Sequence, residues 1–130
     1  MYGFETKKLP KKRCDVAPDG SDVRSLLKLD RGSLAYFELP SNMASRAGVH
    51  DTVEEIWYVL KGRGEMWRKK EEREEIVALE PEVCVSVPTG THFQFRSTGS
   101  EPLSAIVVTM PPWPGPQEWS EVRGVWAPTV

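Results

Sequence analysis

Short runs of apolar and β-branched residues recur along the chain about every 8 to 12 residues, with turn-forming residues between them. Apolar and polar positions alternate in several of these runs, whereas a helical period is nearly absent. The pattern predicts an all-β barrel or sandwich. Strands are expected over residues 25–29, 33–39, 54–60, 83–87, 92–96 and 103–110.

The stretch 65–79 is less clear, because its charged run 69–75 contains good helix formers and opposite charges at helical spacing. A helix there would have no apolar face to bury, and the apolar segments on either side of the run are short. We therefore predict a β-hairpin with the charged run at its tip.

The length of 130 residues, with 39% hydrophobic and 28% charged residues, is typical of one globular domain. We divide the chain into an N-terminal extension with a basic segment (1–24), a barrel (25–112) and a Pro/Trp-rich segment (113–130). Four prolines lie between positions 111 and 116, and this stretch therefore cannot be a central strand of a sheet. We expect this segment to pack on the barrel or on a partner subunit.

The net charge of −2 does not favour a polyanionic partner, and we interpret the basic run at 7–13 as a solvated tail. The first residues lack the pattern of a signal peptide, and the apolar runs are shorter than a membrane span. We expect a cytoplasmic protein with no nucleic-acid partner and no membrane partner. Cys14 and Cys84 have neither metal-binding nor redox spacing and are predicted to be free thiols.

Two segments resemble, in order, the two sequence motifs of the cupin superfamily. The first covers residues 48–62, in which six residues separate Glu55 from Gly62. The second covers residues 82–97 and has Pro88 and Gly90 in the expected places. The resemblance implies a small single-domain cupin, with the double-stranded β-helix or jelly-roll fold and a pocket inside the barrel.

The resemblance also implies a metal centre, since cupin metal sites generally use three histidines and one glutamate. The second histidine and the glutamate of that set correspond to His50 and Glu55, but Gly48 stands at the first histidine position. Phe93 stands at the last one, and His92 precedes it by one residue. A step of one residue along a strand reverses the face on which a side chain lies.

Two interpretations of this site remain open. A bulge or a tighter turn would bring His92 inward, and His50, Glu55 and His92 would then suit one divalent Fe, Mn, Ni or Zn ion. With His92 outward, His50 and Glu55 are either an acid–base pair or an inert hydrogen-bonded pair in the core.

The predicted pocket for a small-molecule ligand is lined by His50, Glu55, Trp57 and Phe93. The resemblance implies either a metal-dependent oxygenase, isomerase or lyase or a metal-free acid–base catalyst acting on a carbonyl, enol or sugar compound. The alternative is a non-catalytic module that binds or senses a small molecule.

Residues on the outer faces of the strands carry two further expectations. Gln94 and Arg96 lie opposite the apolar face of their strand and are interpreted as a solvated face, with a role at the rim of the pocket as the alternative. Ile56 and Tyr58 would face away from the barrel and need to be covered, so we predict a homodimer.

Overall fold

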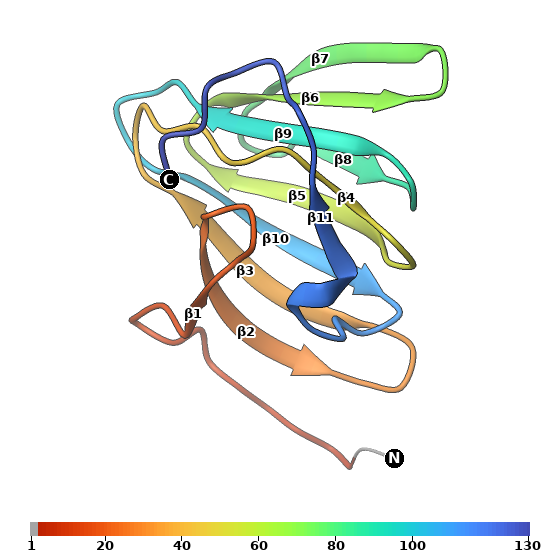
Figure 1. The fold of residues 1–130 in the computed structure, drawn as a ribbon. Coiled ribbons are helices and arrows are strands. Elements are labelled where there is room, and N and C mark those ends of the chain that lie inside the picture. The colour runs from red at the N-terminus through yellow and green to blue at the C-terminus, as the bar shows by residue number, and fades with distance from the viewer. Residues whose placement is uncertain (1–2) are drawn as a thin grey trace.

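Two antiparallel β-sheets face each other in the computed structural model, which describes residues 3–130 (Figure 1). The first sheet has the order β1 (Asp15–Val16), β2 (Asp22–Lys28), β3 (Ser33–Leu39), β10 (Leu103–Met110), β5 (Glu54–Lys61) and β8 (Cys84–Val87). The second has the order β11 (Trp119–Glu121), β4 (Gly48–His50), β9 (His92–Ser97), β6 (Gly64–Lys70) and β7 (Arg73–Leu79). The predicted all-β jelly-roll barrel is therefore confirmed.

The alternation of side chains along β5 shows why these residues form a strand with one buried face. Glu55, Trp57 and Val59 are buried between the sheets, whereas Ile56 and Tyr58 are each 44% exposed on the outside. This is the distribution that a period of two predicts. In β9, Phe93 and Phe95 are likewise buried in the hydrophobic core.

The stretch predicted as a charged hairpin is a hairpin. β6 and β7 pair in continuous register from Gly64 opposite Leu79 to Lys70 opposite Arg73. Glu71 lies in the turn with a φ of 56°, the left-handed conformation that tight hairpin turns require. The charged side chains thus lie at the tip, where no apolar face is needed.

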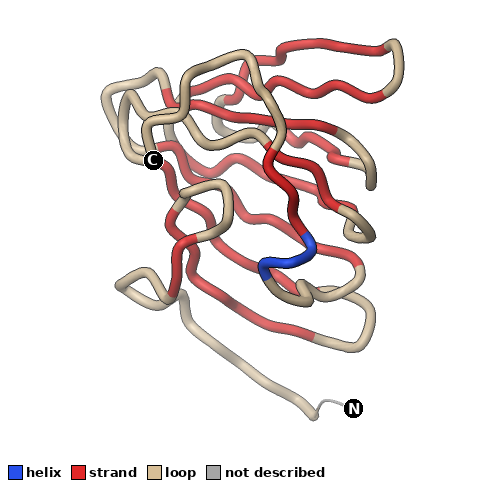
Figure 2. The backbone as a smooth tube through the Cα atoms, viewed as in Figure 1, coloured by secondary structure: helices blue, strands red, loops and turns tan. Residues whose placement is uncertain are grey.

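Both terminal segments add to the barrel, and Figure 2 shows that much of each has no regular secondary structure. At the N-terminal side, β1 pairs with β2. At the C-terminal side, a single 3₁₀ turn, η1 (Pro116–Glu118), leads into β11, which pairs with β4. The C-terminal segment therefore lies across the second sheet.

This cover corrects the expectation of a solvated face on β9. Gln94 is fully buried, because its side-chain amide donates to the carbonyls of Ser45 and Trp126 and accepts from the backbone N–H groups of Val125 and Trp126. Arg96 is half-buried and binds Glu65, with its guanidinium 4.4 Å from the centre of the Trp126 ring. The amide of Gln94 thus fastens the C-terminal segment to the barrel.

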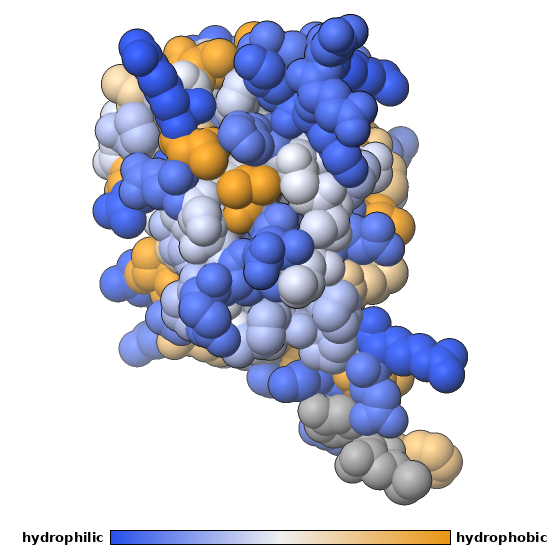
Figure 3. Space-filling view, turned by 45° about the vertical axis from the view of Figure 1, so that its right-hand side comes forward, coloured by the Kyte–Doolittle hydropathy of each residue, from blue (hydrophilic) through white to orange (hydrophobic). Residues whose placement is uncertain are grey.

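The surface seen in Figure 3 is mostly hydrophilic, with hydrophobic residues scattered over it. Cys14 and Cys84 are exposed and unpaired, as predicted. None of the helices in residues 3–130 is long and apolar enough to cross a membrane. The exposed Ile56 and Tyr58 are compatible with a dimer contact, and the homodimer stays a prediction.

Candidate functional site

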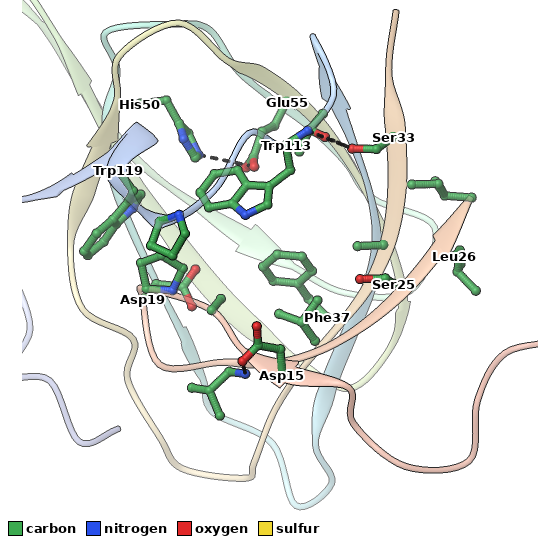
Figure 4. Close-up of a pocket in the computed structure, with 18 of the residues that line it drawn as sticks. Asp15, Asp19, Ser25, Leu26, Ser33, Phe37, His50, Glu55, Trp113 and Trp119 are labelled. Carbon is green, nitrogen blue, oxygen red and sulfur yellow. Dashed lines mark hydrogen bonds and ion pairs between the residues drawn. The ribbon is translucent and has the colours of Figure 1, made fainter. Parts of the chain in front are cut away.

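A cavity of about 350 Å³ lies between the two sheets, lined along β2 and β3 on one side and by His50, Glu55 and Thr109 near the ends of their strands. Its wall combines barrel residues with residues of both terminal segments, as Figure 4 shows. This volume is at the lower end of the range for ligand pockets, so the cavity suits a small molecule. Six lining residues matter most for its chemistry: Asp19, His50, Glu55, Phe93, Trp113 and Trp119.

His50 and Glu55 form a buried pair at the wall of this cavity. His50 is the last residue of β4, and Glu55 is near the start of β5, so a short turn joins the two sheets between them. Nε2 of His50 lies 3.2 Å from Oε2 of Glu55, and the side chains are only 4% and 5% exposed. His50 and Glu55, both predicted as site residues, are thus in contact in the fold.

Trp57 supports this pair from the core side. Its indole Nε1–H donates a hydrogen bond of 3.0 Å to Oε1 of Glu55, so one oxygen of the carboxylate faces Trp57 and the other faces His50. Trp57 itself is not among the residues that line the cavity. Its contribution is therefore to orient Glu55, whereas Phe93 lines the cavity as expected.

Aromatic rings surround the imidazole of His50. Phe93 stacks on it with ring centres 5.5 Å apart, and Trp113 meets it edge-on at 5.7 Å. Nδ1 and Nε2 of His50 and Nε1 of Trp119 are buried and have no hydrogen-bond partner among the described residues. Buried polar atoms normally have a partner, so these three atoms point to a bound molecule or water in the site.

A second carboxylate, Asp19, lines the same cavity and was missed in the sequence. Its Oδ1 accepts hydrogen bonds from the backbone N–H and the hydroxyl of Ser21, at 2.8 and 2.6 Å. Burial raises the pKa of Asp19 to about 6; the Ser21 hydrogen bonds oppose this rise, and the negative charge of Glu55 adds to it. A carboxyl group that titrates near neutrality is suited to proton transfer.

Asp19 belongs to no sequence motif, and only its turn-forming neighbours mark it. Residues 18–21 read Pro-Asp-Gly-Ser, a sequence in which an aspartate is normally expected to stabilise a turn. Trp113 and Trp119 belong to the Pro/Trp-rich segment 113–130. The spacing of residues in the sequence does not predict that these two side chains line the cavity.

The ligand positions of a cupin metal centre are only half present in this barrel. Gly48 and His50 both face inward on β4, and Gly48 is paired with Phe93 on β9. A Cβ atom on Gly48 would overlap the indole ring of Trp119, so the C-terminal segment fills the place of the first histidine. The ring of Phe93 fills the place of the last one.

His92 does not join the site, and the three-ligand interpretation is therefore wrong for this structure. The pairing of β4 with β9 is regular, and it places His92 opposite Val49, on the other face from Phe93. No bulge occurs there to turn the side chain inward. In residues 3–130, no three His, Cys, Asp or Glu side chains are grouped closely enough to hold a metal ion. The donor set does not fit the metal that the fold family implies.

Glu118 fixes the segment that carries the two tryptophans. Its carboxylate accepts hydrogen bonds from the backbone N–H groups of Asp51 and Thr52, at 2.6 and 2.8 Å, and from the hydroxyl of Thr52. Burial alone would raise the pKa of Glu118, but these hydrogen bonds outweigh it and the pKa is lowered. Trp113 and Trp119 are thus held near the His50 turn.

Comparisons with known proteins place this geometry in a family. The Cupin_2 family, described as a cupin domain, matches residues 35–109. An uncharacterized protein of Methanocaldococcus jannaschii, MJ1618, is 30% identical over 103 residues, which are 75% of this chain and 79% of that protein.

Several solved structures share the fold. The protein BH2720 from Bacillus halodurans has a TM-score of 0.65 at 19% identity, over 77% of this chain and 74% of its own. CapF, a capsular polysaccharide assembling protein of Staphylococcus aureus, has a TM-score of 0.68 at 17% identity, over 90% of this chain and 33% of its own. A predicted oxalate decarboxylase from Thermotoga maritima has a TM-score of 0.60 at 19% identity, over 69% of this chain and 79% of its own. The chain belongs to the cupin family.

Proposed function

We propose that the cavity binds a small organic molecule and that His50 and Glu55 transfer a proton to or from it without a metal ion. The observation that carries this proposal is the buried contact between the two side chains at the wall of the cavity. The rings of Trp119 and Phe93 take up the remaining ligand positions, so acid–base chemistry is what the retained residues support.

The pair is arranged to act as one base. Trp57 holds one oxygen of Glu55, and the other oxygen contacts the imidazole, so a proton taken up by either group is stabilised by its partner. The aromatic rings around His50 make its surroundings apolar, which strengthens these charge interactions. Asp19 lines the same cavity and supplies a second group that can give or accept a proton.

The substrate class that suits this arrangement is a small molecule with an acidic C–H bond next to a carbonyl group. Removal of that proton gives an enol or enolate, and return of the proton at a different carbon is an isomerisation. Similar structures include one that is described as a predicted oxalate decarboxylase, which is an enzyme. That likeness supports an enzyme only as a class.

Exchange of C–H protons for deuterium tests this function before the full reaction is known. The full chain is incubated in D₂O with small ketones and aldehydes, with and without an amino group, and exchange next to the carbonyl is followed by ¹H NMR. We expect exchange with at least one compound. The exchange rate should fall by about 10²- to 10⁴-fold in Glu55→Gln and His50→Gln, and a chelator should not change it.

Glu65→Gln is the matched control, because Glu65 is a carboxylate on the outer side of β6 that binds Arg96. Its exchange rate should equal that of the wild type. Absence of exchange with every compound, together with ligand affinity that survives Glu55→Gln, would contradict catalysis and identify a binding or sensing module.

A further inference from the structure

The charged groups of the cavity are unequal in sign. Two carboxylates, Asp19 and Glu55, are each only 5% exposed. Among the described residues, the one buried basic group that lines the cavity with them is the imidazole of His50. Lys28 and Asp15 lie at the edge, where both are exposed to solvent. When both buried carboxylates are ionised, the interior therefore carries a net negative charge in either state of His50.

The two carboxylates differ in what lies beside their oxygens. Trp57 donates a hydrogen bond to Oε1 of Glu55, and Nε2 of His50 lies at an ion-pair distance of 3.2 Å from Oε2, although this nitrogen makes no hydrogen bond among the described residues. Asp19 receives both of its hydrogen bonds from Ser21 at Oδ1, and within residues 3–130 no hydrogen bond reaches Oδ2. Asp19 is only 5% exposed and lines the cavity, so Oδ2 is free to accept a hydrogen bond from a ligand or water there.

The remaining wall also favours positive charge. Phe37, Phe93, Trp113 and Trp119 line the cavity, and the face of an aromatic ring attracts a cation through its quadrupole. His50 provides an independent sign of a ligand, since it is only 4% exposed and its Nδ1 has no hydrogen-bond partner in the described part of the chain. An anion in the same place would be repelled by both carboxylates.

We propose that the ligand of this cavity is a small organic cation, whose ammonium group binds Oδ2 of Asp19 and whose apolar part lies among the aromatic rings. This inference deepens the proposed function, because it places the ligand in the same cavity and states its charge. A substrate of this kind carries an amino group close to the carbon that loses its proton.

Three probes of the same shape and different charge test the inference by calorimetry on the full chain at about pH 8, where benzylamine is cationic. The other two probes are neutral benzyl alcohol and anionic benzoate. We expect benzylamine to bind about tenfold or more tighter than benzyl alcohol, with benzoate the weakest. In Asp19→Asn, the affinity for benzylamine should fall to that for benzyl alcohol. The affinity for benzyl alcohol should stay unchanged.

Asp22→Asn is the control for the loss of one negative charge, because Asp22 pairs with Arg13 on the surface near the same turn. It should keep the full preference for benzylamine. Equal affinities for the three probes, tightest binding of benzoate, or no binding of any probe at millimolar concentration would overturn the inference. A cation preference without deuterium exchange would overturn only catalysis, whereas exchange of neutral ketones without a cation preference would overturn only the ligand class.

Discussion

The two ends of the space between the sheets are built from the same strands and have opposite character. Where β3 and β10 begin their pairing, Leu39 lies opposite Leu103, and Val59 of β5 packs nearby in the same apolar cluster. At the other end of these strands, Thr109 lies opposite both Ser33 and Glu55. Along these three paired strands, the space between the sheets is filled by apolar side chains at one end and is hollow and polar at the other.

This difference separates stability from function along a single set of strands. Apolar side chains that interlock at the filled end supply most of the folding free energy, as in any close-packed core. At the hollow end, buried polar groups cost stability unless they are fully hydrogen-bonded. Proteins retain such groups where binding or catalysis requires them, which makes the hollow end the candidate functional site.

The filled end should respond most strongly to truncation. Phe95 is 2% exposed and packs edge-on against Trp57, with ring centres 4.8 Å apart. Phe95→Ala leaves a cavity in a close-packed region and is expected to lower the free energy of unfolding by about 3 to 5 kcal/mol in urea titrations. Phe4→Ala, at a fully exposed phenylalanine, is the control and should have no effect. If Phe95→Ala lowered the free energy of unfolding by less than about 1 kcal/mol, this end of the barrel would not be close-packed.

The hollow end should respond in the opposite direction when its buried carboxylate is neutralised. The pKa of Asp19 is 3.8 in a model compound and about 6 in the fold, so the folded state holds more protons than the unfolded state between these values. Stability therefore falls as pH rises from about 4 to 6, by up to about 3 kcal/mol, and stays low above this window.

Asp19→Asn removes this penalty and keeps an oxygen that accepts the Ser21 hydrogen bonds. The variant should be more stable than the wild type by up to about 3 kcal/mol near neutral pH and equal to it below about pH 4. Urea titrations across this range measure the difference. A destabilised variant at neutral pH would show that the carboxylate contributes to the fold rather than to a ligand site.

The contact of Trp119 with Gly48, which stands at the first ligand position of the cupin motif, can be tested with a double-mutant cycle. Gly48→Ala introduces a Cβ atom where the indole of Trp119 lies, and a loss of about 1 to 3 kcal/mol is expected. In a Trp119→Ala background, the same change should be neutral or stabilising, since alanine suits a strand better than glycine. Equal effects in both backgrounds would mean that the two residues are not in contact.

The smallest effect is expected at the anchor of the C-terminal segment. Glu118→Gln replaces charge-assisted hydrogen bonds to Asp51 and Thr52 with neutral ones and should cost about 1 kcal/mol at neutral pH. Because the pKa of Glu118 is lowered in the fold, its contribution is present above 4.5 and is lost as pH falls through the folded value. Glu121→Gln, at an exposed position of β11, is the control for urea titrations at neutral and acidic pH.

Much of the fold could be predicted from the sequence, since alternation marks the faces of β5, β8 and β9. The same alternation placed Trp57 and Phe93 inward correctly. It could not assign Gln94, because the segment that buries this residue lies about thirty positions further along the chain. Alternation of apolar and polar residues shows that a strand has two different faces. Which segment covers the polar face depends on tertiary contacts that alternation does not show.

The candidate site was predicted only as far as local motifs extend. His50 and Glu55 are five residues apart and follow the cupin spacing, so their contact was foreseeable. The orientation of His92 depended on the register of β4 with β9, which one sequence does not define. Asp19, Trp113 and Trp119 reach the cavity from the two ends of the chain, and no local pattern connects them.

Metal content tests the central claim most directly, because the claim is that the rings of Trp119 and Phe93 fill two ligand positions of a cupin metal centre and leave no metal site. The untagged full chain is measured by plasma mass spectrometry, as purified and after chelation and reloading with Fe, Mn, Ni and Zn. The account predicts well below one equivalent of each metal in the wild type, unchanged in His50→Ala and His92→Ala. Near-stoichiometric metal in the wild type that disappears in both variants would contradict it.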